Sequence, residues 1–162
     1  MRFNIWATTG FAIAFIALLI DQAYKWWMLY VYDIAARGLV TITPFFDITL
    51  VWNKGISYGL FQQESATGRY VLIGIILCIA VVLVIWLMQA RNYIMAVAMG
   101  LVLGGAVGNV VDRIYYGAVA DFFSFHYRGF NWYVFNLADI WVVAGAALLI
   151  YDSVRNDAQR SN

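Results

Sequence analysis

The sequence predicts an α-helical integral membrane protein with four transmembrane helices and a small β-sheet on one membrane face. Hydrophobic residues make up 64% of the 162 residues and charged residues only 12%. Soluble domains are about 45–50% apolar and about 25% charged. Aromatic residues gather near the ends of four apolar stretches, as they do at membrane interfaces. The length allows a single membrane-embedded domain over residues 1–162.

We expect the four spans at about residues 5–28, 70–89, 93–113 and 136–153. About 20 helical residues cross the hydrocarbon core of a bilayer. The second and third stretches reach this length easily, whereas the first and fourth reach it only with the polar residues at their ends. Small residues repeat on one face of the third span, at Ala96, Gly100, Gly104 and Gly108. This spacing allows a neighbouring helix to approach closely.

Two long loops, at about residues 29–69 and 114–135, are expected on the same side of the membrane. Residues 39–52 are rich in Val, Ile, Thr and Phe, are interrupted by Pro44 and lead to Asn53-Lys54-Gly55. This pattern predicts a strand, a turn and a strand. Residues 119–135 are aromatic and centred on Arg128-Gly129, which predicts a second hairpin. Together they predict a sheet on the membrane surface.

The distribution of basic residues predicts the orientation. The side with the termini carries Arg2, Arg91, Arg155 and Arg160. The loop side carries more in total, namely Lys25, Arg37, Lys54, Arg69, Arg113 and Arg128. The density of basic residues favours the side with the termini as the cytoplasmic side. Its four arginines lie in far fewer residues, and the positive-inside rule applies to short loops. We therefore expect both termini in the cytoplasm.

Composition argues against several classes of function. The net charge is +1 and there is no Lys/Arg run, so nothing favours a nucleic-acid partner. The chain has one cysteine, Cys78, and one histidine, His126, so it lacks an internal disulfide and a zinc-ligand cluster. We expect Cys78 to be a buried structural residue. No metal or cofactor is expected.

Polar residues at the ends of the spans, on the loop side, are the candidate functional residues. Ionisable groups at membrane depth are costly and usually functional. Asp21 and Lys25 are spaced to pair across one helical turn. The other members are Asn109, Asp112, Arg113, Asp121, Asn136 and Asp139. Two carboxylates that share a site cannot both ionise easily, and such a pair suits general acid and base catalysis on a water.

Three other aspartates are expected to be solvated, away from this cluster. They are Asp33, Asp47 and Asp152.

Five motifs resemble those of the lipoprotein signal peptidase (signal peptidase II) family. They are Asp21-Gln22-Ala23-Tyr24-Lys25, Asn53-Lys54-Gly55-Ile56-Ser57, Gly104-Gly105-Ala106-Val107-Gly108-Asn109-Val110-Val111-Asp112-Arg113, Gly117-Ala118-Val119-Ala120-Asp121-Phe122 and Phe135-Asn136-Leu137-Ala138-Asp139. The resemblance implies a multi-pass aspartyl endopeptidase of the bacterial inner membrane, with its active site near the periplasmic face. It implies removal of the signal peptide from diacylglyceryl-modified prolipoproteins, by cleavage before the lipidated cysteine.

The same resemblance implies roles for individual residues. Asp121 and Asp139 would be the catalytic pair. Substrate binding or support of the site would fall to Asn53, Gly55, Asn109, Arg113 and Asn136, and structural polar roles to Asp21, Lys25 and Asp112. Arg113 or Asn109 could contact the peptide backbone or the lipid glycerol. The implied partners are the lipidated prolipoprotein and membrane lipid, with no obligate protein partner.

Two alternatives remain open at this stage. The first is a small proton-coupled transporter that uses Asp121 and Asp139 as a proton relay. Transporters usually carry an acidic residue within a span, however, and not two on one rim. The second is a structural membrane protein without activity.

Overall fold

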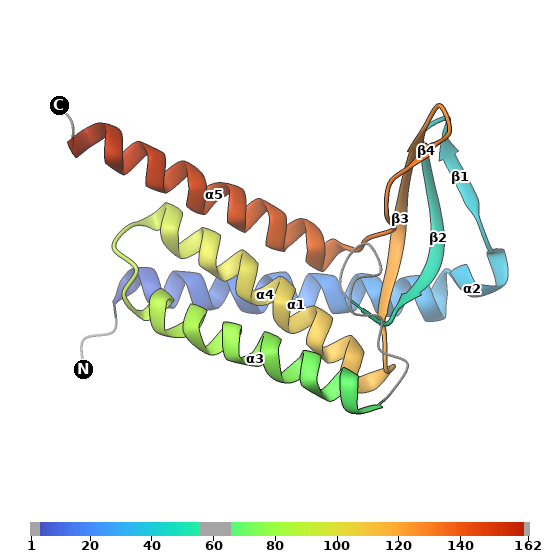
Figure 1. The fold of residues 1–162 in the computed structure, drawn as a ribbon, viewed down its shortest axis with the longest axis horizontal. Coiled ribbons are helices and arrows are strands. Elements are labelled where there is room, and N and C mark those ends of the chain that lie inside the picture. The colour runs from blue at the N-terminus through green and yellow to red at the C-terminus, as the bar shows by residue number, and fades with distance from the viewer. Residues whose placement is uncertain (1–3, 56–65, 161–162) are drawn as a thin grey trace.

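The computed structural model describes residues 4–55 and 66–160. Ile56 and Ser57, which belong to the second motif, lie outside the described residues. Four helices in this part are long and apolar enough to cross a membrane: Ile5–Val31, Thr67–Met88, Tyr93–Tyr115 and Leu137–Asn156. They run lengthwise beside one another, with a sheet at one end and both termini at the other (Figure 1). The chain therefore has the predicted fold class.

The elements follow in a simple order. Helix α1 (Ile5–Trp26) continues as the π-helical segment η1 (Trp27–Val31) and is followed by the short helix α2 (Ile34–Arg37). Strands β1 (Val40–Thr43) and β2 (Phe46–Asn53) precede helices α3 (Ala66–Met88) and α4 (Tyr93–Tyr115). Strands β3 (Val119–Tyr127) and β4 (Phe130–Asn131) lead to helix α5 (Leu137–Arg160). Helix α5 is longer than the expected span.

Asparagine caps begin several of the long helices. The Asn4 side chain accepts a hydrogen bond from the Trp6 N–H at 3.1 Å at the start of α1. The Asn92 side chain accepts one from the Met95 N–H at 2.8 Å at the start of α4. Such caps satisfy backbone donors that the first turn of a helix leaves unpaired.

Helix α4 lies at the centre of the bundle, and its small residues fix its distance from its neighbours. A Cβ atom at Gly100 would lie 2.5 Å from the Gly10 carbonyl oxygen of α1, and one at Gly104 would lie 2.6 Å from that of Ala14. On the side of α5, a Cβ at Gly105 would collide with the Ala138 carbonyl. The predicted small-residue face is therefore a site of close helix packing.

The four strands form one antiparallel sheet in the order β1-β2-β3-β4. The turn between β1 and β2 lies at Pro44-Phe45, whereas Asn53 ends β2. The predicted turn at Asn53-Lys54-Gly55 is therefore not the hairpin turn. The turn between β3 and β4 lies at Arg128 and Gly129. Both residues have positive φ, 48° and 85°, as two-residue hairpin turns favour.

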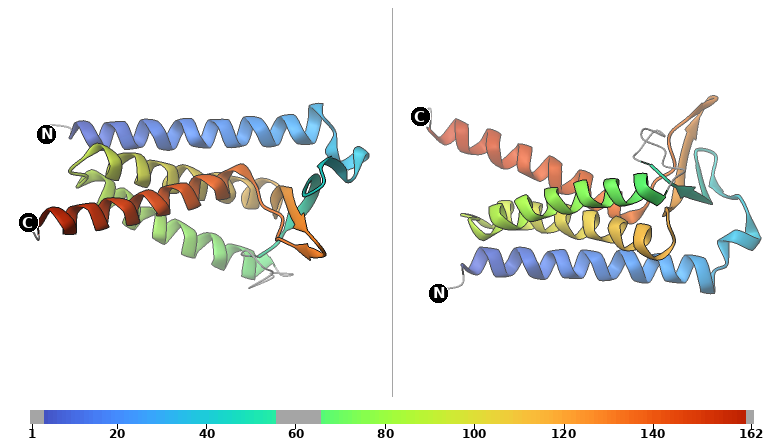
Figure 2. Two further views of the ribbon diagram at one scale, coloured as in Figure 1. Left: turned by 90° about the horizontal axis from the view of Figure 1, so that it is seen from above. Right: turned by 60° about the horizontal axis from the view of Figure 1, so that its bottom comes forward.

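The sheet is attached to the extension of α1. Met28, Ile34, Ala120 and Phe122 form a buried apolar cluster between η1, α2 and the strands. The two further views show the sheet standing at the end of the helices and turned away from their axes (Figure 2). This arrangement places the start of β3 beside the start of α5.

Candidate active site

Asp121 lies on β3 and is 1% exposed. In the register of the sheet, Val51 is opposite Asp121, and Asn53 is two residues beyond Val51. Side chains two residues apart lie on the same face of a strand, so Asn53 reaches Asp121 diagonally. Its Nδ2 donates to Oδ2 of Asp121 at 3.0 Å.

Asp139 lies in the first turn of α5. Its backbone N–H donates to Oδ1 of Asn136 at 3.0 Å, and its Oδ2 accepts from the Asn136 N–H at 3.3 Å. This reciprocal arrangement is the pattern of a capping box. Asn109 of α4 donates to the other carboxylate oxygen, Oδ1, at 2.8 Å. Asp139 is thus fixed both by its own helix and by α4.

Asn136 connects the two carboxylates. Its Nδ2 donates to Oδ1 of Asp121 at 2.6 Å and to Oδ1 of Asn109 at 3.1 Å, and its backbone N–H faces Asp139. The Asn136 side chain is fully buried. The predicted residues Asn53, Asn109 and Asn136 therefore form one hydrogen-bonded network with both aspartates.

Arg113 and Gly55 form the wall of the site next to Asn53. The Arg113 guanidinium donates to the Gly55 carbonyl at 2.7 Å and to the Asn109 carbonyl at 3.1 Å. The Gly55 N–H donates to Oδ1 of Asn53 at 2.9 Å. This bond orients the Asn53 amide so that its NH₂ group faces Asp121.

Asp21, Lys25 and Asp112 lie behind the network. Lys25 Nζ is 2.9 Å from Oδ2 of Asp21 and 2.8 Å from Oδ2 of Asp112. The three side chains are at most 2% exposed. Gln22, which sequence reasoning did not assign to the site, donates to both carboxylates, at 3.1 and 3.0 Å. Its position next to Asp21 in the first motif was the signal for it.

The electrostatics favour a protonated carboxyl group in this site. Burial raises the pKa of Asp121 from its ordinary value of 3.8 to about 7, and the charge of Asp139 adds to the shift. The hydrogen bonds from Asn53 and Asn136 lower the pKa of Asp121 and so oppose this shift. A carboxyl group with a pKa near 7 can exchange a proton at neutral pH, as general acid–base catalysis requires.

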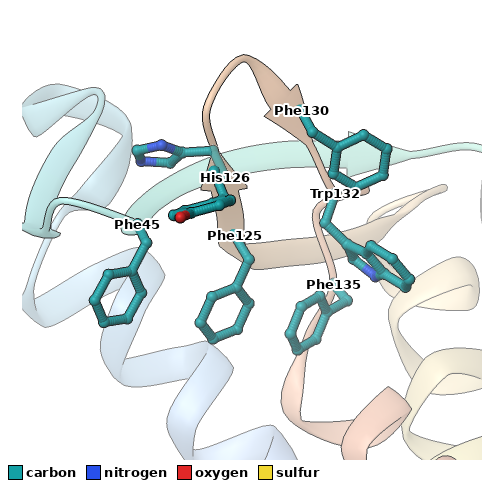
Figure 3. A pocket seen from close by; sticks show the side chains of 7 residues that line it. Phe45, Phe125, His126, Phe130, Trp132 and Phe135 are labelled. Carbon is teal, nitrogen blue, oxygen red and sulfur yellow. The ribbon is translucent and has the colours of Figure 1, made fainter.

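The site opens on an apolar groove along α5. The groove has a volume of about 410 Å³ and is lined by Trp132, Tyr133, Phe135, Asp139, Ile140, Val143, Ala144 and Ala147. A second pocket of about 480 Å³ shares Trp132 and Phe135 with it and extends over the sheet. Phe45, Phe125 and Phe135 point to the same side of this pocket (Figure 3). Apolar side chains therefore line the approach to Asp139.

Three expectations outside the site are wrong. Asp47 and Asp152 are each 8% exposed and are not solvated. Asp47 lies 2.9 Å from His126 Nε2, and Asp152 accepts from Asn92 Nδ2 at 3.2 Å. His126 and Asn92 are distant in sequence from these aspartates, so no local pattern revealed these two contacts. Cys78 is exposed on the outside of α3 and not buried within the protein. Asp33 is exposed, as expected.

Comparison with known proteins decides the family. Residues 13–155 match the family described as signal peptidase (SPase) II. The chain belongs to this family. It is therefore an aspartic-type protease and a bacterial membrane protein. No comparison supports the transporter alternative.

Relatives and solved structures agree with this membership. A lipoprotein signal peptidase of Beijerinckia indica is 51% identical over 148 residues, which cover 91% of this chain and 89% of the relative. The lipoprotein signal peptidase of Nitrobacter hamburgensis is 48% identical over 149 residues, or 90% and 91% of the two chains. Two structures of bacterial membrane enzymes match with TM-scores of 0.80 and 0.75 at 26% and 28% identity. The first match covers 94% of this chain and 91% of that enzyme, and the second covers 90% and 92%.

Proposed function

We propose that this protein removes the signal peptide from diacylglyceryl-modified prolipoproteins, with Asp121 and Asp139 as the catalytic pair. The observation that carries the proposal is the Asn136 bridge, which joins two carboxyl groups in one buried network at the mouth of an apolar groove. The lipoprotein signal peptidases to which the chain is similar support the substrate class.

The chemistry follows from the pair of carboxyl groups. One aspartate, ionised, takes a proton from a water that attacks the scissile carbonyl. The other, protonated, polarises that carbonyl and then helps to protonate the leaving amine. The two share one proton as a pair. Within the described residues there is no group of three or more metal-ligating side chains, so every step is assigned to side chains of the network.

Asparagine side chains hold the two carboxyl groups in place for this proton exchange. Asn53, Asn109 and Asn136 each donate to a carboxylate oxygen. Fixed donors stabilise charge without reorganising during the reaction. Arg113 reaches the carbonyls of Gly55 and Asn109, and we assign to it support of the site wall. Gly55, buried beside Asn53, belongs to the surface that the peptide approaches.

The groove suits a lipid-borne substrate. Asp139 lies in the first turn of a membrane-spanning helix, and the groove continues from it along α5 over Val143 and Ala147. An acyl chain or the apolar signal helix can stay in the bilayer while the bond to be cut reaches the carboxyl groups. The cleaved bond would be the one before the lipidated cysteine.

For the location we propose the inner membrane, with the sheet and the site at the periplasmic face and both termini in the cytoplasm. Both termini lie at the end of the helices opposite the sheet (Figure 1). The density of arginines on that side supports a cytoplasmic location. Reporter fusions that fluoresce only in the cytoplasm should be bright at the C-terminus and dark when inserted at the β3–β4 turn.

The decisive experiment uses the purified protein in detergent with a lipidated precursor and the same precursor without lipid. We expect cleavage of the lipidated form before its cysteine, identified by mass spectrometry, and little cleavage of the other. Activity without a vesicle gradient is also incompatible with an obligatory transport function. No cleavage of the lipidated precursor by well-folded protein would refute the proposal.

A further inference from the structure

The triad of Asp21, Lys25 and Asp112 is buried as completely as Asp121 of the catalytic pair. Asp21 and Asp112 are 0% exposed and Lys25 is 2% exposed. Buried ion pairs are weak contributors to stability, because desolvation opposes their attraction. Stability alone is therefore a poor explanation for three charges at this place.

Each carboxylate of the triad holds one particular backbone amide. Oδ1 of Asp21 accepts from the Ala138 N–H at 2.9 Å. Oδ2 of Asp112 accepts from the Ala120 N–H at 3.2 Å. Ala138 directly precedes Asp139, and Ala120 directly precedes Asp121.

The start of α5 and the start of β3 are thus held against α1 and α4. Both Ala120 and Ala138 are 0% exposed, so no solvent can replace these bonds. A shift of either backbone moves the aspartate that follows it.

The ammonium group of Lys25 acts on the catalytic pair through a third contact, the side chain of Asn109. Lys25 Nζ donates to Oδ1 of Asn109 at 3.2 Å. A lysine ammonium can only donate hydrogen bonds, so it holds the amide oxygen of Asn109 on its own side. The NH₂ group of Asn109 must then face Asp139, to which it donates at 2.8 Å.

We propose that the Asp21–Lys25–Asp112 triad is a positioning device for the catalytic pair. Its carboxylates fix the backbones before Asp139 and Asp121, and its ammonium sets the orientation of Asn109. The three are positioning residues and not catalytic ones, because they act through groups that contact the pair. The inference rests on the assignment of Asp121 and Asp139 in the proposed function.

The first test measures kcat and KM on folded protein in detergent for Asp21→Ala and Asp112→Ala. Loss of either anchor should lower kcat by about 10- to 100-fold, because small displacements of a catalytic group have effects of this order. KM should change little, since the triad does not touch the substrate. Asp21→Asn retains an oxygen for the Ala138 N–H and should recover part of the lost kcat.

The matched control is Asp152→Ala. Asp152 is another buried carboxylate that accepts hydrogen bonds from Asn92 and Asn156, at the opposite end of α4 and α5. Its removal should lower the thermal unfolding temperature while kcat per folded molecule stays at the wild-type value. The comparison separates a general loss of buried hydrogen bonds from loss of positioning.

The second test is the pH profile of kcat/KM for Lys25→Met. The charge of Lys25 favours the ionised form of Asp121. A neutral residue removes this effect, so the profile should move to higher pH. A purely structural role would leave the profile of the folded protein in place. Lys25→Gln, which keeps a donor for Asn109, is used where the Met variant does not accumulate.

The outcomes distinguish failure of the proposed catalytic pair from failure of the proposed positioning role. If folded Asp121→Asn or Asp139→Asn protein still cleaves the precursor, the proposed catalytic pair is wrong. If those variants are inactive but the triad variants keep wild-type kcat and pH profile, only the positioning role is overturned. It is also overturned if no triad variant yields folded protein while Asp152→Ala does, because the triad is then a folding element.

Discussion

Asn136 donates its side-chain amide to Oδ1 of Asp121 at 2.6 Å, from a position that also caps the helix carrying Asp139. One residue thus sets the place of both carboxyl groups. Asn136→Ala removes the donor and the cap together. A lost cap costs about 1 kcal/mol, and an unpaired buried group adds about 1–3 kcal/mol. We expect a lower unfolding temperature and a large loss of kcat. A folded Asn136→Ala protein with normal kcat would contradict the bridging role.

Asp121→Asn and Asp139→Asn test the catalytic pair directly. Each keeps the side-chain volume but cannot exchange a proton, so each should lower kcat by about 10²- to 10⁴-fold. The double variant should be hardly worse than either single one, because residues that act as a unit are strongly non-additive. Cells with either variant as the sole copy should accumulate lipidated, uncleaved precursor.

The control for this pair is Asp33→Asn. Asp33 is exposed and caps α2 through its side chain, a bond that asparagine can also accept. Cleavage by this variant should equal that of the wild type.

The raised pKa of Asp121 predicts how stability changes with pH. The pKa is 3.8 ordinarily and about 7 in the folded protein. The folded state therefore binds more protons between these values, and folding becomes less favourable as pH rises through this window. Relative to Asp121→Asn, the wild type should lose up to about 4 kcal/mol between pH 4 and pH 8. Thermal unfolding at both pH values measures this, and an unchanged difference would contradict the burial of a titrating Asp121.

Gly55→Val tests the wall beside Asn53. The Gly55 carbonyl accepts from Arg113 and its N–H donates to Asn53. A branched side chain at this buried position should displace one or both contacts and block the approach of the peptide. Activity should fall while the protein still inserts and accumulates. Full activity would show that this segment only connects β2 to the following residues.

Catalysis should require neither a metal nor a thiol. The described residues contain no cluster of metal ligands, and Cys78 lies on the outer side of α3, away from the carboxyl groups. Cleavage by Cys78→Ala in the presence of a strong chelator should therefore stay near the wild-type rate. A large loss in either condition would indicate a different catalytic class.

Sequence patterns predicted the fold where a strong periodicity existed. The small residues from Ala96 to Gly108 recur every four positions, and they meet α1 in the structure. The turn-like segment Asn53-Lys54-Gly55 is not the β1–β2 turn, which lies at Pro44-Phe45, where Pro44 interrupts the apolar run. Gly55 and Asn53 instead form a local hydrogen bond at the end of β2.

The members of the site could be predicted, but their connections could not. Polar residues at the ends of apolar spans are conspicuous, so the sequence singles out Asn136 and Asp139, whereas Asp121, eight residues past Arg113, is indicated by its motif. The Asn53–Asp121 bond depends on the register between β2 and β3, which composition does not encode. The burial of Asp152 likewise depends on Asn92, sixty positions away in the chain.

The glycines of α4 have a consequence for how a membrane-borne substrate gains access. Gly100 and Gly104 bring α4 against the backbone of α1, and Gly105 brings it against α5. These three helices therefore form a closely packed frame in which backbone carbonyls leave no room for a side chain at these positions. At the glycines, no side chain or lipid fits between α4 and these two neighbours. We therefore expect a membrane-borne substrate to reach the carboxyl groups over the outside of the frame, along the apolar groove on α5.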